Sequence, residues 1–351
     1  MNIVCVEPLG ISQEHFEELK KEFANQGHDF HYYLDRKEDA PTLISRMKEA
    51  DIVVISNIKL TAEVLTECAR LRYLSVAFTG LDHIDLDYCK NHNIAVQNAA
   101  GYSTTAVSEL AIGLMLDALR HITHLDGTIR QGEGRGNFLG RELSGKTVGV
   151  VGTGAIGTAV IRLLKAFGCK VLAYNRSQHE EVVALGAQYT DLDTLMRESD
   201  IVTLHVPMTA ETHHLISAER IALMKPSAIL VNTARGNVVD IPALAQALTA
   251  GTIAGAAVDV YEQEPPLPQD HPLLQAPNCV CVPHIAFASR EAFDIRADIV
   301  FDHVRNFLHS GDKKKKKKQT INHKRQTTNY ATSCHPIDAY VSRSCHLGSP
   351  R

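Results

Sequence analysis

Three residues near the ends of apolar segments carry side chains that could together bind a carboxylate and move a proton. Arg235 follows the apolar run AILVNTA, Glu264 comes shortly after GAAVDVY, and His284 follows VCVP. A planar guanidinium pairs with both oxygens of a carboxylate, and a histidine beside a carboxylate can hold a proton near neutral pH. Taken singly, a histidine at a strand end is more often a structural hydrogen-bonding residue than a catalytic one, and a glutamate before prolines is more often a solvated loop residue. The three residues become informative as a set.

A glycine-rich segment, GTGAIG at residues 152–157, predicts a dinucleotide-binding turn. It stands between an apolar strand and an amphipathic helix, and a second apolar strand, KVLAYN, follows. Gly152 permits the tight turn, Gly154 lets a pyrophosphate approach the backbone, and Gly157 lets helix and strand pack closely. The amino end of the helix offers unpaired amides to the phosphates. This context makes the signal far more specific than the glycine pattern alone.

The end of the second strand bears on the choice between NAD(H) and NADP(H). In NAD-binding sites it normally carries an acid that binds the adenosine ribose hydroxyls. This chain instead has Asn175, Arg176 and Ser177 there. Because Arg176 and Ser177 could hold a 2′-phosphate, the sequence favours NADP(H). The alternative is an arginine that only stacks on adenine.

Strand-length apolar runs alternate with amphipathic helical stretches from the first residue to about Gly311. Many of the runs are continuously apolar, as in DIVVIS, which is typical of strands covered by helices on both faces. The alternation predicts an α/β fold with doubly wound parallel sheets. Residues 48–65 and 197–215 both place a Thr-Ala-Glu turn after a buried strand, which suggests two domains of similar construction. Residues 103–122 predict a helix buried against more than one element.

Composition excludes several classes of partner and location. The chain has 351 residues, 44% of them hydrophobic, which is enough for two domains. Its net charge of −4 provides no basic field, so we expect neither a nucleic-acid nor a membrane partner. We expect a cytoplasmic location, since no segment reads as a secretory signal or a membrane span. The cysteines show no disulfide or metal-ligand spacing before the C-terminal tail, so we expect reduced thiols and no metal site.

Seven motifs in order resemble the D-isomer-specific 2-hydroxyacid dehydrogenase family, and the resemblance covers about residues 1–311. It implies a Rossmann NAD(P)-binding domain, residues 102–287, inserted into a smaller flavodoxin-like substrate domain formed by residues 1–101 plus 288–311. Closure of the cleft between the domains is expected to exclude water. The motifs are TGLDHIDL (79–86), GYSTTAVSELAIG (101–113), GKTVGVVGTGAIG (145–157), LHVPMTAET (204–212), NTARG (232–236), AAVDVYEQEP (256–265) and PHIA (283–286).

The family includes glycerate, phosphoglycerate and D-lactate dehydrogenases and hydroxypyruvate reductases. The resemblance therefore implies an NAD(P)-dependent oxidoreductase that interconverts a small 2-keto acid and its D-2-hydroxy acid, as a homodimer. Arg235 would clamp the substrate carboxylate, and His284, bonded to Glu264, would give a proton to the carbonyl oxygen. Glu264 favours keto-acid chemistry, because related formate dehydrogenases have glutamine at that place. The alternative function is that of a related corepressor, a dinucleotide-sensing binding protein without significant turnover.

The resemblance also implies further contacts for the cofactor and the substrate. The implied cofactor contacts, besides the three glycines, are Thr104, Ala155, Ile156, Val206, Pro207, Thr212, Thr233 and Asp259. The residues implied to border the substrate, besides Arg235 and His284, are Asn57, Thr79 and Gly80. Some members carry a tryptophan in the loop before GKTVG, whereas this chain has no tryptophan and has Phe138 in that region. The substrate side-chain pocket is therefore left open.

The C-terminal segment 312–351 departs from the family pattern. It begins with six lysines in a row, lacks apolar periodicity, and is predicted to be a disordered tail. Its two Cys-His pairs do not have a standard zinc-ligand spacing. Our hypothesis is an out-of-frame read-through that starts at the lysine codons; an intact reading frame in independent sequencing reads would exclude it. The alternative is a genuine basic tail that touches nucleic acid or membranes weakly.

Overall fold

The computed structural model describes the backbone of residues 1–330 and the side chains of residues 1–310. Residues Met1–Asp302 form one compact unit. It contains two sheets, one of five strands and one of seven, and every paired strand within them runs parallel. The predicted α/β class with two doubly wound parallel sheets is confirmed.

The first sheet has the strand order β2-β1-β3-β4-β5. The chain starts at a central strand, moves to one edge, then returns past β1 to build the other side, which is the doubly wound order of flavodoxin-like domains. Its strands are β1 (Asn2–Cys5), β2 (Asp29–Tyr32), β3 (Ile52–Ile55), β4 (Tyr73–Val76) and β5 (Ala95–Asn98), and its helices are α1 (Gln13–Asn25), α2 (Ala40–Met47), α3 (Ala62–Thr66) and α4 (Leu86–Asn91).

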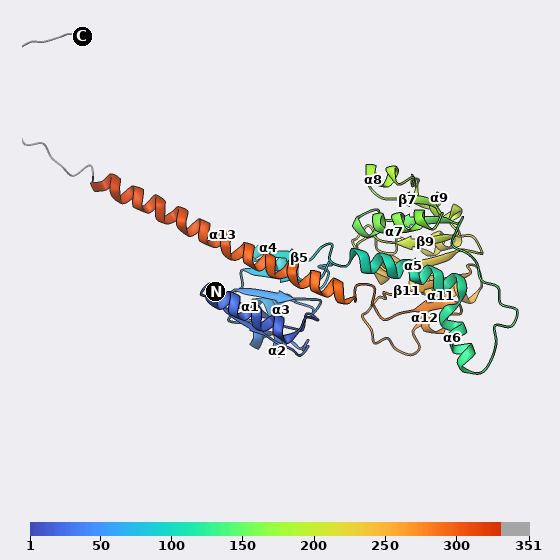
Figure 1. The fold of residues 1–351 in the computed structure, drawn as a ribbon, viewed down its shortest axis with the longest axis horizontal. Helices are drawn as coiled ribbons and strands as arrows, with labels where there is room; N and C mark the ends of the chain where they lie inside the picture. Colours follow the sequence, from blue (N-terminus) through green and yellow to red (C-terminus); the bar gives the residue numbers. More distant parts are fainter. Residues whose placement is uncertain (331–351) are drawn as a thin grey trace, which may run out of the picture. The chain divides into compact units, whose positions relative to one another are not determined.

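Helix α13 (Arg290–Tyr330) begins against this first sheet (Figure 1). Phe301 contacts the rings of Phe23 in α1 and Phe30 in β2. Ser75 in β4 donates a hydrogen bond from its hydroxyl to the carbonyl of Val300 over 3.0 Å. A helix therefore begins at Arg290, and within its residues up to Asp302 it packs on the first sheet through Val300 and Phe301.

The second sheet has the strand order β12-β11-β10-β9-β6-β7-β8. The order reverses between β6 and β9, which is where sheets of this kind bind dinucleotides. Its strands are β6 (Thr147–Val151), β7 (Lys170–Tyr174), β8 (Gln188–Tyr189), β9 (Ile201–Leu204), β10 (Ile229–Asn232), β11 (Gly255–Val258) and β12 (Cys279–Cys281). Its helices are α5 (Thr104–Arg120), α6 (Ile122–Arg130), α7 (Ala155–Ala166), α8 (Glu180–Ala184), α9 (Leu192–Glu198), α10 (Ala218–Ala222), α11 (Ile241–Thr249) and α12 (Pro272–Gln275), with a short 3₁₀ turn at Gly236–Val238.

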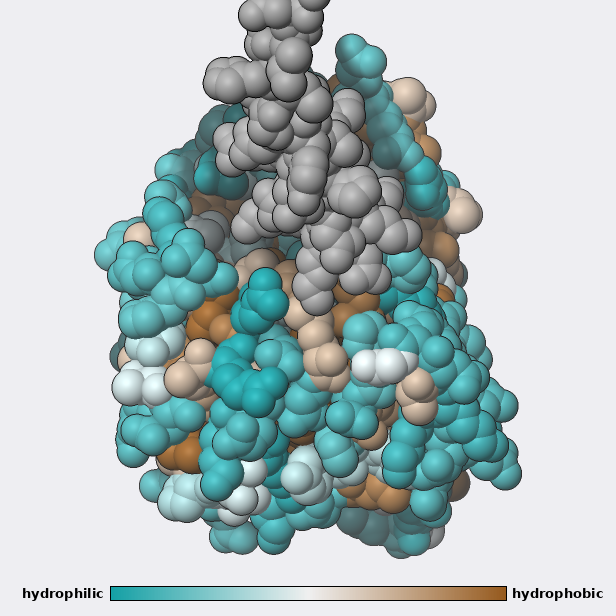
Figure 2. Space-filling view, turned by 90° about the vertical axis from the view of Figure 1, so that its left-hand side faces the viewer, coloured by the Kyte–Doolittle hydropathy of each residue, from teal (hydrophilic) through white to brown (hydrophobic). Residues whose placement is uncertain are grey.

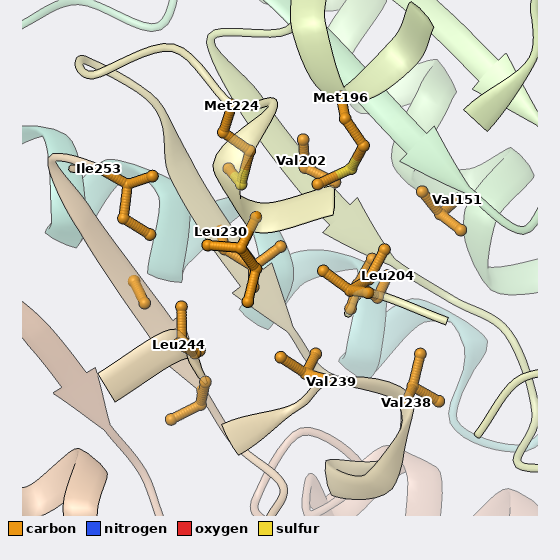
Figure 3. Close-up of a cluster of buried hydrophobic side chains, with 14 of the residues drawn as sticks. Val151, Met196, Val202, Leu204, Met224, Leu230, Val238, Val239, Leu244 and Ile253 are labelled. Carbon is orange, nitrogen blue, oxygen red and sulfur yellow. The ribbon is translucent and has the colours of Figure 1, made fainter. Parts of the chain in front are cut away.

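Helices cover both faces of the second sheet, which explains why its strands are apolar throughout. Successive residues of one strand enter different cores: Val150 packs with α5 and α7, whereas Val151 packs with α9 and α11. Figure 3 shows the second of these cores, in which Met196 of α9 and Leu244 of α11 surround Leu230 of β10. The strands are thus packed on both faces, so the positions of their ends are fixed, and with them the residues that follow these ends.

One face of the molecule shows how hydrophilic and hydrophobic side chains are distributed on the surface (Figure 2). Hydrophilic side chains dominate the face shown in Figure 2, and hydrophobic ones appear there in separate areas. Across the described residues, we find no helix whose length and apolar content would let it cross a bilayer.

Two features of the fold differ from the sequence prediction. The short edge strands β2 and β8 were not predicted, because their sequences DFHY and QY lack a strand-length apolar run. Helix α13 continues to Tyr330, where the prediction for residues 312–351 is a disordered tail. Residues 312–330 contain no glycine or proline that would end a helix. Residues 331–351, including both Cys-His pairs, lie outside the described residues.

Candidate active site

The three predicted chemical residues follow three neighbouring strands at the same edge of the second sheet. Arg235 comes after β10, Glu264 after β11 and His284 after β12, and these strands pair in that order. Parallel strands present their carboxyl ends at one edge, where open α/β sheets bind their ligands. The three residues therefore follow neighbouring strands, as their positions after apolar runs in the sequence predict.

His284 and Glu264 form a hydrogen-bonded pair. Nδ1 of the histidine lies 2.8 Å and 3.0 Å from the two carboxylate oxygens of Glu264. The bond to His284 lowers the pKa of Glu264, although burial acts in the opposite direction. The rings of Phe78 and Phe287 pack edge-on against the imidazole, with centroids 6.1 Å and 5.3 Å away. No described residue bonds to Nε2, so this nitrogen is the one available for a substrate.

The backbone of His284 is held by Asp259. His284 has a left-handed conformation with φ of 54°, and its amide donates to the Asp259 carbonyl over 2.9 Å. The Asp259 carboxylate is fully buried and accepts the amides of Ile285 and Ala286 at 2.7 Å and 2.9 Å. Burial raises the pKa of Asp259. Asp259, implied by the resemblance to contact nicotinamide, thus fixes the turn that carries the catalytic candidate His284.

Arg235 contacts the segment that follows β4 of the first sheet. Its Nε donates to Oδ2 of Asp82 over 2.9 Å, and Nη1 donates to the carbonyl of Ala234 over 2.8 Å. A Cβ added at Gly80 would lie 1.9 Å from Nη2 of the arginine, so only glycine leaves room for the guanidinium. Gly236 likewise abuts the Tyr261 backbone, which a Cβ would meet at 2.0 Å. These two glycines explain why an arginine can stand at the tip of this strand.

The glycine turn after β6 fits a dinucleotide. Gly152 has φ of 95°, and a Cβ there would lie 2.5 Å from the carbonyl oxygen of His205. A Cβ at Gly157 would lie 1.9 Å from the Gly152 carbonyl oxygen, whereas one at Gly154 meets no atom within 4 Å. Open space at Gly154, directly before α7, is what a pyrophosphate requires. The buried hydroxyl of Thr233 has no partner among the described residues, which fits a polar ligand at this edge.

The other implied cofactor contacts lie in the loop after β9 and in the first turns of two helices. Val206 follows β9 and would contact a Cβ at Gly152. Thr212 closes its loop by donating to the Pro207 carbonyl over 2.6 Å. Ala155 and Ile156 form the first turn of α7, and Thr104 is the first residue of α5.

The segment after β7 contains no carboxylate. Asn175 donates from its side chain to the Ser177 carbonyl over 2.9 Å and lies 3.2 Å from a ring nitrogen of His179. Arg176 is exposed and contributes to a lowered pKa of Glu211, after hydrogen bonds from Thr209 and the Glu211 backbone. The guanidinium is thus exposed just after the end of β7.

Several residues of this site were missed by sequence reasoning. Asp82 lies inside the quoted motif TGLDHIDL, but its ion pair with Arg235 joins positions 153 residues apart. Phe78 and Phe287 carry no signal that separates them from core aromatics. Asn57, which was implied to border the substrate, accepts a hydrogen bond from Arg36. No group of three potential metal-ligating side chains occurs within residues 1–310.

Comparisons with known proteins agree with this geometry. Residues 112–286 match the sequence profile of the D-isomer specific 2-hydroxyacid dehydrogenase NAD binding domain. The chain is 45% identical over 261 residues to glyoxylate reductase of Thermofilum pendens, covering 72% of this chain and 76% of that protein. It is 41% identical over 253 residues to hydroxypyruvate reductase of Thermotoga maritima, covering 71% and 82%.

A solved structure gives the same result for the fold. D-lactate dehydrogenase of Aquifex aeolicus, solved with NAD and lactic acid, superposes with a TM-score of 0.77 at 33% identity, over 88% of this chain and 96% of that one. These relatives give no support to the corepressor-like alternative. The strand-end trio, the glycine turn and the comparisons together show that this chain belongs to the D-isomer-specific 2-hydroxyacid dehydrogenase family.

Proposed function

We propose that this protein reduces a small 2-keto acid such as glyoxylate or hydroxypyruvate to the corresponding 2-hydroxy acid, and that Arg235, Glu264 and His284 perform the roles implied by the family. The observation that carries the proposal is the His284–Glu264 pair, which leaves Nε2 of the histidine without a described partner. The ring of Phe78 lies near both this imidazole and the guanidinium of Arg235. The names of the two curated relatives, glyoxylate reductase and hydroxypyruvate reductase, support this substrate class.

The chemistry follows from these side chains. The substrate carboxylate exchanges with the Asp82 carboxylate on the guanidinium of Arg235, because both are planar oxygen acceptors for the same donors. A bound reduced dinucleotide supplies the hydride that the carbonyl carbon needs. Negative charge then develops on the carbonyl oxygen, and Nε2 of His284 donates its proton there. Glu264 fixes the tautomer and stabilises the protonated ring, while the two phenylalanine rings exclude water.

The dinucleotide would be held by the turn Gly152–Gly157, the first turn of α7, and the loops after β9 and β10 that contain Val206, Pro207, Thr212 and Thr233. We further propose that NADPH is preferred over NADH. The exposed Arg176, with Asn175 and Ser177 beside it and no carboxylate at the end of β7, supports this preference. Arg176→Ala should raise the KM for NADPH at least tenfold and leave the KM for NADH within about twofold, and equal effects on both would contradict the proposal.

A homodimer is the quaternary state that the surface supports. Helix α6 buries none of its side chains, and three apolar residues in this region are largely exposed: Ile122 (55%), Ile129 (65%) and Leu139 (82%). Exposed apolar groups of this kind mark interaction surfaces, and a two-fold dimer is the commonest closed assembly. Sedimentation of Ile129→Glu/Leu139→Glu should show a monomer where the unchanged protein shows a dimer.

The six cysteines of the described part are free thiols, which supports the predicted cytoplasmic location.

The central test is oxidation of NADPH and of NADH, followed by absorbance, with glyoxylate, hydroxypyruvate, pyruvate and phosphohydroxypyruvate as substrates. His284→Ala should lower kcat by about 10²–10⁴-fold, the usual contribution of general acid catalysis. His92→Ala is the matched control, because this exposed histidine stacks on Tyr88 beside α4 and takes no part in the site. Folded protein that binds a dinucleotide but reduces none of the four acids would refute the proposal.

A further inference from the structure

A buried carboxylate stands at the end of the first strand of the smaller sheet. Glu7 follows β1, and its side chain is 1% exposed. Its Oε1 accepts the backbone amides of Ser56 at 2.7 Å and Ile58 at 3.5 Å, and its Oε2 accepts from the guanidinium of Arg36. A lone buried carboxylate would be strongly destabilising, so this arrangement requires the arginine as its partner.

Arg36 is fixed by three acceptors. Its Nη1 donates to Glu7 and, over 2.8 Å, to Oδ1 of Asn57, while Nε donates to Glu38 over 2.7 Å. No described residue accepts a hydrogen bond from Nη2. The side chain is 40% exposed, so the guanidinium is held from behind and accessible from the front.

Glu7, Arg36 and Asn57 lie where a sheet of this topology binds ligands. In a sheet of order β2-β1-β3-β4-β5, the chain leaves β1 and β3 in opposite directions, and a crevice opens at their carboxyl ends. Glu7 follows β1, Asn57 follows β3, and Gly80, which touches Arg235, follows β4. Arg36 is also close enough to Glu264 to help lower its pKa, after His284 and Arg235. A second guanidinium, that of Arg36, therefore lies in the electrostatic neighbourhood of the proposed substrate site.

Resting on the proposed function, we propose that Arg36 is a specificity-determining residue that donates a hydrogen bond from Nη2 to an uncharged hydroxyl on C3 of the 2-keto acid. The preferred substrate is then a 3-hydroxy-2-keto acid of the hydroxypyruvate type. The charges around Arg36 disfavour a substrate that carries a phosphate on C3. Two carboxylates already neutralise the guanidinium, and a phosphate with a charge of about −1.5 to −2 would face a cluster that is not positive.

Discrimination against other substrates follows from Nη2 of Arg36, which has no acceptor among the described residues. A site built to bond a hydroxyl rejects an analogue that lacks it, because the donor is then left desolvated and unpaired. Pyruvate places a methyl group there. Glyoxylate has no C3 and leaves room for water. Hydroxypyruvate should therefore be reduced more efficiently than pyruvate.

The test compares Arg36→Gln with Arg70→Gln. Arg70 is the matched control, because it makes exposed ion pairs with Glu49 and Asp51 at the opposite, amino-terminal edge of the same sheet. Loss of a hydrogen bond from a charged donor should lower kcat/KM for hydroxypyruvate about 10- to 100-fold in Arg36→Gln, and much less for pyruvate and glyoxylate. Equal losses for the three substrates would overturn the proposal, as would a preference for phosphohydroxypyruvate that Arg36→Gln abolishes.

A second variant and a binding measurement keep the result interpretable. Arg36→Lys retains the charge that Glu7 requires but cannot bond in the forked geometry, so it should fold and still lose the preference for hydroxypyruvate over pyruvate. Calorimetric titration of D-glycerate and D-lactate into protein saturated with reduced dinucleotide needs no turnover. D-glycerate should bind at least tenfold more tightly than D-lactate, and only when Arg36 is present. If turnover fails while this difference holds, the proposed reaction is wrong and the subsite stands; equal affinities overturn the subsite even where turnover is observed.

Discussion

Replacing Gly80 with alanine should disable the site while leaving the fold intact. The added Cβ would lie 1.9 Å from Nη2 of Arg235, and the nitrogen must retreat by about 1.5 Å to reach an ordinary contact of 3.4 Å. The obstructing atom is the tip of a flexible side chain, so the arginine moves and the backbone does not. A misplacement of about 1 Å can cost about 10²-fold in rate, and kcat/KM for a 2-keto acid should fall at least that far.

The assay for Gly80→Ala combines kinetics with urea unfolding and dinucleotide binding. The free energy of unfolding should change by less than about 1 kcal/mol, since the substitution removes no side chain from a hydrophobic core. The Kd for the dinucleotide should stay within about twofold, because Gly80 lies on the substrate side. Gly134→Ala is the control, as its Cβ would meet no atom within 4 Å. A kcat/KM for Gly80→Ala within threefold of the unchanged protein would refute the reasoning about Arg235.

Three further predictions concern cofactor binding, pH and stability. Gly154→Ala should weaken dinucleotide binding without loss of stability, whereas Gly157→Ala, whose Cβ would strike the Gly152 carbonyl at 1.9 Å, should lose both; titration and urea unfolding would show whether the two variants differ. Because His284 lowers the native pKa of Glu264, the pair stabilises the fold above the unfolded glutamate pKa of about 4.3 and loses this effect as pH falls through the lower native value. The stability difference between the unchanged protein and Glu264→Gln should thus shrink between about pH 5 and 3, and a constant difference would contradict this. Arg296 donates to the carbonyls of Leu9 and Ala77 and lies over the Phe293 ring, so Arg296→Ala should destabilise by about 3 kcal/mol; a loss below about 1 kcal/mol would show that these contacts are replaced by water.

The sequence predicted those parts of the fold and site that depend on local pattern. The continuously apolar runs identified the central strands, and the strand-end rule brought Arg235, Glu264 and His284 to one edge. The glycine spacing located the dinucleotide turn before α7. These features are encoded within a few residues, and the resemblance to the family extended them to named roles.

The rest depends on contacts between distant residues, which no local pattern encodes. The Asp82–Arg235 pair and the Glu7–Arg36 pair join segments that meet only after both sheets have formed. Asp259 could be placed after β11, but its use as an acceptor for the amides after His284 follows only from the turn geometry. The edge strand β2 has no apolar run, because only Phe30 of its four residues is buried.

The packing of α13 on the first sheet has a consequence for how the chain matures during synthesis. About 190 residues separate Asn98, at the end of β5, from Arg290, at the start of the helix. At about 5–20 residues per second, a ribosome needs about 10–40 s to make that length. During this interval the aromatic face formed by Phe23 and Phe30 lacks its partner Phe301. The amino-terminal sheet, although translated first, completes its core last, so a nascent chain that stops before Arg290 should expose this face to chaperones while its nucleotide-binding sheet is already folded.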